Sequence, residues 1–209
     1  MPIFCRGARP PGLMAAGEEK GDGAWCLLRA LELSADRFVW TWLHREDVGR
    51  IISAAARSTF VLCGPGGSGS LAAELVAARL EPTIIMPDGR RSTQPTGRIL
   101  IGWDDAVRRP IGDLLPLLRR ADHIELLVAE ADSLVCAQAL RHLRDFGLGA
   151  VLRVVPSDIE ISEFLARTWS QLRADWLILS RARDIRRGPW YRSLPRLIAD
   201  PICPLIVGC

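Results

Sequence analysis

The densest group of residues that could bind a ligand is a run of arginines in the segment SRARDIRRGPWYRSLPR (180–196). Trp190 and Tyr191 lie in the same segment. Guanidinium groups bind phosphates bidentately and aromatic rings stack on bases, so the segment could form an anion or nucleotide site. The alternative, which we prefer, is a solvated loop that keeps its arginines for solubility. The arginines are Arg181, Arg183, Arg186, Arg187, Arg192 and Arg196.

A second candidate site is the glycine-rich turn GPGGSGS (64–70), which follows an apolar run and precedes a helix-like segment. Gly64 and Gly67 have G-x-x-G spacing, and the backbone N–H groups of such a turn bind anions at a helix N-terminus. A flexible turn between a strand and a helix explains the same residues without a ligand. A lone glycine-rich loop is a weak signal, and we prefer the plain turn.

The sequence shows no set of residues for acid–base or nucleophilic chemistry. Its three histidines, at positions 44, 123 and 142, fall on a strand end, a strand start and a helix, so no base lies beside a nucleophile. The acidic pairs at 46–47 and 104–105 fit helix N-termini, where carboxylates offset the macrodipole. We therefore expect no enzyme, and a phosphatase or nucleotidase is the least favoured reading.

The six cysteines contain no C-x-x-C pair and no histidine spaced to complete a zinc site, so we expect no metal. Cys63 and Cys203 lie in or beside apolar runs, where a reduced thiol behaves as a small buried hydrophobe. This pattern favours a reducing compartment and predicts a cytoplasmic protein. No segment approaches the roughly 20 apolar residues that cross a bilayer, and the N-terminus lacks the pattern of a signal peptide.

The bulk charge argues against nucleic-acid or membrane partners. The chain of 209 residues carries 27 basic and 24 acidic residues, a net charge of only +3. Its hydrophobic content of 49% is ample for a core. Any anion site must therefore be local.

From residue 25 onward, strand-like and helix-like segments alternate. The expected strands lie at 37–44, 59–64, 82–87, 98–103, 123–130, 150–155, 175–180 and 203–208. The expected helices lie at 25–35, 45–58, 70–80, 104–121, 131–147, 159–174 and 189–199, with Gly147 as a C-cap. This alternation, with strands that are apolar throughout, predicts an α/β fold with a parallel, doubly wound sheet. Ligands bind such sheets outside the carboxyl ends of the strands, where the strand order reverses.

The two halves of the chain look like one unit repeated. ARSTFVLCG (56–64) corresponds to LRADWLILS (172–180), and EPTIIMP (81–87) corresponds to DPICPLIVG (200–208). The second copy has five expected strands and the first has three. We predict an irregular segment at 1–24, a partial domain at 25–88, a linker at 89–97 and a complete domain at 98–209.

The phrases GRILIGWDD, LLPLLRRADHIELL, ADWLILS and ADPICPLIVG resemble the first and last strands of the universal stress protein family in its tandem form. The resemblance covers about residues 25–209. It implies a five-stranded, Rossmann-like parallel sheet of the adenine nucleotide alpha hydrolase type. It also implies a non-enzymatic, cytoplasmic stress-response or regulatory protein, which forms a homodimer through the edge strand CPLIVG near the C-terminus.

ATP-binding members of that family carry a G-x-x-G-x9-G-[S/T] signature after the fourth strand. Here the first two glycine positions hold Ser180 and Arg183, and the later pair falls within 191–194. Because side chains would occupy the ligand's place, we expect no cofactor, with ATP or AMP on the arginine-rich loop as the alternative. The positions that the resemblance implies are Asp104, Val128, Leu179, Ser180, Arg183, Arg187 and Ser193, with Gly64 and Gly67 in the first copy. Asp104 is read equally well as a helix N-cap.

Overall fold

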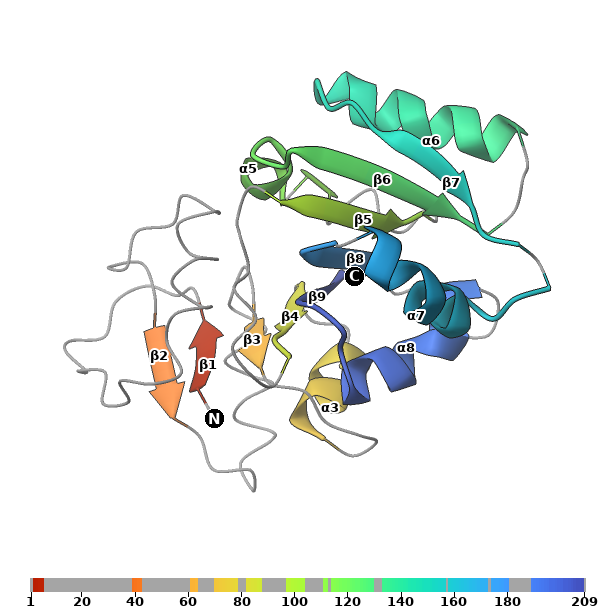
Figure 1. Cartoon of the computed structure of the whole chain (residues 1–209). Helices are drawn as coiled ribbons and strands as arrows, with labels where there is room; N and C mark the ends of the chain where they lie inside the picture. Colours follow the sequence, from red (N-terminus) through yellow and green to blue (C-terminus); the bar gives the residue numbers. More distant parts are fainter. Residues whose placement is uncertain are drawn as a thin grey trace.

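The computed structural model describes residues 2–5, 39–42, 61–63, 70–78, 82–87, 97–103, 111–112, 114–129, 133–156, 158–172, 174–180 and 189–208. Within these residues, one mixed sheet has the strand order β2-β1-β3-β4-β9-β8-β5-β6-β7 (Figure 1). The strands are β1 (Pro2–Cys5), β2 (Val39–Trp42), β3 (Val61–Cys63), β4 (Thr83–Ile85), β5 (Arg98–Gly102), β6 (His123–Val128), β7 (Val151–Val154), β8 (Trp176–Ser180) and β9 (Leu205–Gly208). The helices are α3 (Leu71–Ala77), α5 (Leu115–Leu118), α6 (Ser133–Asp145), α7 (Ile161–Leu172) and α8 (Pro189–Ala199).

Five of the strands, in the order β9-β8-β5-β6-β7, run parallel to one another. Leu100 at the centre of β5 pairs with Glu125 of β6 on one side and with Leu177 of β8 on the other. Most residues of the inner strands are buried, as strands covered on both faces require. The prediction of a parallel, doubly wound α/β sheet is confirmed.

Helices cover both faces of this sheet, and alternate residues of each strand build two separate cores. Figure 1 shows α5 and α6 on one face, and α7, α8 and α3 on the other. Leu100, Leu177 and Leu205 point into the core under α7 and α8. Ile101 and Ile178, which alternate with them, point into the core under α5 and α6.

Helix α6 ends as its sequence predicts. Gly147 has a φ of 74°, and its N–H donates to the carbonyl of Arg144 over 2.8 Å. The N–H of Leu148 donates to the carbonyl of Leu143 over 3.0 Å. These two bonds form a Schellman motif, whose left-handed residue favours glycine. The predicted C-cap is therefore confirmed.

The C-terminal strand β9 has a neighbour on each side, which corrects its assignment as an edge strand. It pairs in parallel with β8 and antiparallel with β4, where Ile84 lies opposite Ile206. Both hydrogen-bonding edges of CPLIVG are therefore occupied within the chain. A second molecule cannot add to this strand in the arrangement described, because the strand has no free edge.

The segment 1–24 is also not wholly irregular, contrary to our prediction. Pro2–Cys5 forms β1, which pairs antiparallel with β2 and β3. The run PIFC is apolar but short, and the Pro, Gly and charged residues that follow it have no periodicity, which led to the prediction of an irregular segment. The expected helices at 25–35 and 45–58 and the linker at 89–97 lie largely or wholly outside the described residues.

The expected helix 104–121 is described only in its second half, where α5 spans four residues. Pro116 lies in the first turn of α5, where a missing N–H is tolerated. Among the described residues, no helix has the length and hydropathy of a membrane span.

Candidate functional site

The path of the chain through the sheet defines one place where a ligand would bind. From β5 the chain proceeds outward through β6 to β7, then crosses back to β8 on the other side of β5. The direction of winding therefore reverses between β5 and β8. We call the carboxyl ends of these two strands, at Gly102 and Ser180, the switch point. In doubly wound sheets, ligands bind outside the strands at this position.

The side chain of Trp190, in the first turn of α8, lies at the switch point. It is 1% exposed, and its Nε1 donates to the backbone carbonyl of Trp103 over 3.1 Å. Trp103 directly follows β5, and its own N–H continues the ladder by donating to the carbonyl of Leu127 over 2.8 Å. The indole is therefore anchored to the end of β5 by a buried hydrogen bond.

Gly102, the last residue of β5, provides the surface on which this indole lies. A Cβ atom on Gly102 would lie 2.9 Å from Cδ2 and 3.0 Å from Cε2 of Trp190. It would also lie 2.5 Å from Cδ2 of Leu179. Because real Cβ contacts are longer than this, the close approach of α8 to β5 requires glycine at this position.

Three of the predicted site residues have described side chains. Val128 is buried at the end of β6, in the core under α5 and α6. Leu179 is buried next to last in β8, in the core under α7 and α8. The structure thus brings Leu179 and Trp190 together and places Val128 on the other face of the sheet. Ser180 is described only as the last residue of β8.

Ser193 has a structural partner. Its hydroxyl oxygen accepts a hydrogen bond from the backbone N–H of Ser162 over 3.0 Å, and both residues are buried. Ser162 lies in the first turn of α7, where N–H groups have no partner within the helix. Ser193 therefore caps α7 from α8 and fixes the two helices against each other. Its part in binding a nucleotide stays a prediction.

The other predicted site residues lie outside the described part of the chain. This holds for the candidate aspartate and the two arginines of the complete domain, and for the two glycines of the first copy. They are Asp104, Arg183, Arg187, Gly64 and Gly67.

The sequence left Trp190 either as a ring that stacks on a ligand or as part of a solvated loop, and the structure instead buries it in the core. A signal was present in the helical spacing of Trp190, Leu194, Leu197 and Ile198, which form one apolar face. All four side chains are buried in the same core. This spacing alone indicates that the indole lies on the buried face of α8.

A charged cluster on β6 and β7 was also not predicted. Glu125 is 5% exposed, and its Oε2 accepts a hydrogen bond from Nε of Arg153 over 3.0 Å. Its Oε1 lies 3.4 Å from Nε2 of His123. His123 begins β6 and Glu125 lies in its middle, whereas Arg153 is next to last in β7. The arrangement neutralises a buried carboxylate, which costs stability when it has no partner.

The ring of His142 and the thiol of Cys63 on β3 fit packing better than chemistry. The ring of His142 lies between those of Trp103 and Phe146, with centroid separations of 5.7 and 5.1 Å. Burial raises the pKa of the Cys63 thiol to about 12, which removes it as a nucleophile at neutral pH. Among the described residues, no group of three or more His, Cys, Asp or Glu side chains is placed to hold a metal ion.

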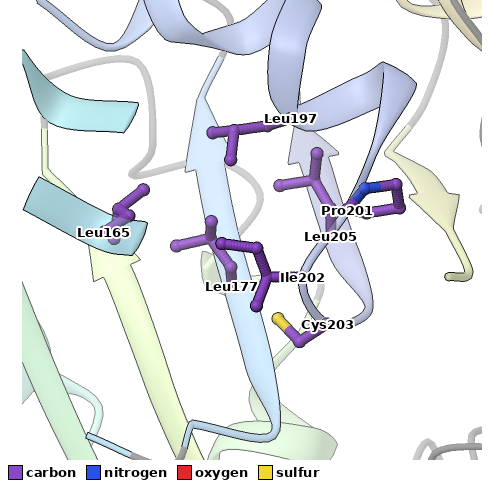
Figure 2. Close-up of a pocket in the computed structure, with 7 residues that line it drawn as sticks. All are labelled: Leu165, Leu177, Leu197, Pro201, Ile202, Cys203 and Leu205. Carbon is purple, nitrogen blue, oxygen red and sulfur yellow. The ribbon is translucent and has the colours of Figure 1, made fainter. Parts of the chain in front are cut away.

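The pocket drawn in Figure 2 lies elsewhere, near the amino ends of β8 and β9. Its volume of about 10 Å³ is close to the space that one water molecule needs. Its lining is apolar, apart from the thiol of Cys203, which donates to the carbonyl of Pro204 over 3.2 Å. It contains none of the predicted site residues, and it is too small for a nucleotide. The lining residues are Leu165, Leu177, Leu197, Pro201, Ile202, Cys203 and Leu205.

The fold is similar to that of solved universal stress proteins. A universal stress protein from Archaeoglobus fulgidus DSM 4304 superimposes with a TM-score of 0.58 at 14% identity, over 77% of this chain and 64% of that one. The match thus spans less than two thirds of the Archaeoglobus protein. A Pseudomonas aeruginosa UCBPP-PA14 protein, provisionally described as a universal stress protein, gives a TM-score of 0.48 at 13% identity, over 92% and 79% of the two chains. No protein-family model and no curated protein matches the sequence.

Proposed function

We propose that this chain is a universal stress protein-like regulatory protein of the tandem type, which acts through assembly and not through catalysis. The observation that carries the proposal is the antiparallel pairing of β4 with β9. It joins two similar units, β3-α3-β4 and β8-α8-β9, in each of which a helix connects two parallel strands. The pairing supports a dimer-like arrangement of two repeats within one chain, with the first repeat incomplete.

The residues at the switch point support the proposal that the nucleotide-binding signature has been lost. Ser180 stands at the end of β8, where the ATP signature begins with glycine. The buried indole of Trp190 lies against the end of β5, next to the position where a ligand would enter. The side chains at this end of the sheet therefore favour a protein that does not depend on ATP.

The assembly that we propose is a homodimer in the cytoplasm. Since β9 has two neighbours within the chain, the homodimer needs another surface. Strand β7 ends the sheet in the described residues, and its Val151 and Val154 are 51% and 40% exposed. Exposed β-branched residues on an edge strand favour pairing with another chain. The described cysteines Cys63, Cys136 and Cys203 are free thiols, which supports a reducing compartment.

Two measurements test the proposal. Light scattering after size-exclusion chromatography should give twice the monomer mass of 23.0 kDa, and a monomer at all concentrations would refute the dimer. Thermal unfolding with ATP or AMP should give no change in Tm. A ligand present at ~100 times its Kd stabilises the folded state by ~2.7 kcal/mol, so binding would be detected easily. A saturable rise in Tm would instead favour a nucleotide-responsive module built on the arginine-rich loop.

A further inference from the structure

We propose that the outer edge of β7 pairs with the same edge of a second copy of this chain, antiparallel and with Leu152 on the two-fold axis. The ion pair between Glu125 and Arg153 permits this pairing, because it holds the arginine away from the edge. The inference deepens the proposed function and rests on it for the existence of a homodimer. It adds the register of the interface and the buried carboxylate that controls it.

The backbone of β7 offers three residues for pairing on its outer side. The N–H of Val155 donates to the carbonyl of Val128 over 2.8 Å, which fixes the direction in which the backbone of this segment faces β6. Because the backbone groups of successive strand residues point to opposite sides, those of Ala150, Leu152 and Val154 point away from β6. Among the described residues, no strand lies on that side of β7 (Figure 1). Such an edge is a template for pairing with another chain.

Two-fold symmetry and the sequence select one register for this pairing. When two copies of one strand pair antiparallel around a two-fold axis, one residue lies opposite itself. With Leu152 on the axis, Ala150 lies opposite the partner's Val154. All three outward residues then form hydrogen-bonded pairs.

Each neighbouring register meets an obstacle. An axis at Val151 would set Val154 opposite Leu148, and the N–H of Leu148 already donates within its own chain over 3.0 Å. An axis at Arg153 would place two arginines face to face, and like charges directly opposite destabilise a pair of strands. An axis at Arg153 or at Val154 would also bring Pro156, which has no N–H, opposite one of the outward residues. The edge is therefore complementary to itself in one register.

The charge on β7 is held back from the edge. Charged side chains on an edge strand commonly prevent pairing with other chains. Here Nε of Arg153 donates to Oε2 of Glu125 over 3.0 Å, so the guanidinium is directed over β6 and its charge is balanced. Glu125 is buried, whereas Val151 and Val154 are exposed. The edge is therefore left with an apolar surface, and Glu125 is the positioning residue that keeps it so.

The register sets Val151 opposite the partner's Arg153, which provides a charge test. The two residues form a non-hydrogen-bonded pair, in which side chains approach each other most closely. Val151→Lys should therefore repel the arginine and give a monomer of 23.0 kDa at a concentration at which wild-type protein is a dimer. Val151→Glu should attract the same arginine and stay dimeric. The position is exposed, so neither change should prevent folding, and light scattering after size-exclusion chromatography gives the masses.

The two variants distinguish this inference from the proposed function. A monomer for the lysine variant with a dimer for the glutamate variant supports the inference. If the lysine variant stays dimeric, the inference is wrong and the interface lies elsewhere, while the homodimer of the proposed function stands. Two monomers would also overturn it, because a register with Val151 opposite itself repels either charge. A wild-type monomer would refute the proposed homodimer, and this inference with it.

Glu125→Gln tests the positioning role separately, by sedimentation equilibrium. Without the carboxylate, the guanidinium of Arg153 is released beside the edge. We expect the dimer dissociation constant to rise ~10-fold, because the unbalanced charge occurs on both sides of the axis. Glu125→Gln/Arg153→Gln removes that charge and should restore the dimer, which a merely structural loss would not do.

Glu163→Gln is the matched control for this test. Glu163 pairs with Arg167 on the exposed surface of α7, so its loss should leave the dissociation constant unchanged. The role of Glu125 is overturned if Glu125→Gln dimerises like wild-type protein or is weakened no more than Glu163→Gln. It is also overturned if the double variant with Arg153→Gln does not recover the dimer.

Discussion

Substituting alanine for Gly102 should destabilise the protein through the indole of Trp190. The new Cβ would lie 2.9 Å from Cδ2 of Trp190 and 2.5 Å from Cδ2 of Leu179. The leucine methyl is the end of a rotatable side chain and can move aside. The indole cannot move as easily, because its Nε1 is bonded to the carbonyl of Trp103.

The size of the effect follows from overpacking. Adding carbon to a well-packed core costs ~1–3 kcal/mol, and we expect Gly102→Ala to fall in this range. In a protein of 209 residues, each kcal/mol lowers the Tm by ~2–4 °C. Trp190→Ala alone should cost ~3–5 kcal/mol, because it leaves a cavity. In the Trp190→Ala background, Gly102→Ala should destabilise the protein by at least ~1 kcal/mol less than it does in the wild-type protein, because the clash with the indole is gone.

The assay is a double-mutant cycle measured by urea unfolding and followed by circular dichroism. Gly112→Ala is the control, because an added Cβ there would have no atom within 4 Å. The reasoning is refuted if Gly102→Ala costs the same with and without Trp190, or if it costs no more than Gly112→Ala. Either result would mean that the indole does not lie on Gly102.

Four further predictions concern single features of the fold. Gly147→Ala should lower the free energy of unfolding by ~1 kcal/mol, because the residue has a φ of 74°. Gly149→Ala should be close to neutral in the same urea assay, because Gly149 also has free space around it but no such positive φ. Ser193→Ala should lower stability by ~1 kcal/mol by removing the acceptor for the N–H of Ser162, and an unchanged Tm would contradict this role. Native-state alkylation at neutral pH should modify the half-buried Cys136 well before Cys63, and mass spectrometry would show the order. Burial raises the pKa of Cys63 from 9.0 to about 12. The stability that the protonated thiol contributes is therefore complete below pH 9 and is lost as the pH rises toward 12. In Cys63→Ala, the free energy of unfolding should fall less steeply over this pH range.

The arrangement of strands and helices from residue 98 onward could be predicted from the sequence. Runs such as ILIG and LILS are apolar without interruption, and only a sheet covered on both faces buries them completely. The end of α6 could also be predicted, because glycine is the usual residue directly after the end of a helix. These signals are local, and each depends on a few neighbouring residues.

The candidate site could not be predicted in the same way, because its contacts join residues far apart in the chain. The bond from Trp190 to Trp103 spans 87 positions, and the bond from Ser193 to Ser162 spans 31. Neither is visible as a motif. The internal pairing of β4 with β9 was also hidden, because an apolar C-terminal strand reads the same whether its partner lies in the same chain or in another. Several predicted ligand positions, including Asp104 and Arg183, fall outside the described residues and stay predictions.

The most direct test of this account is the electron density at the carboxyl ends of β5 and β8 in crystals grown with millimolar ATP or AMP. We predict density for the Trp190 indole on Gly102, bonded to the carbonyl of Trp103, and no nucleotide beside it. Density for a base in that place, with Trp190 turned away and phosphates on the arginine-rich loop, would contradict the proposal that the nucleotide site is degenerate.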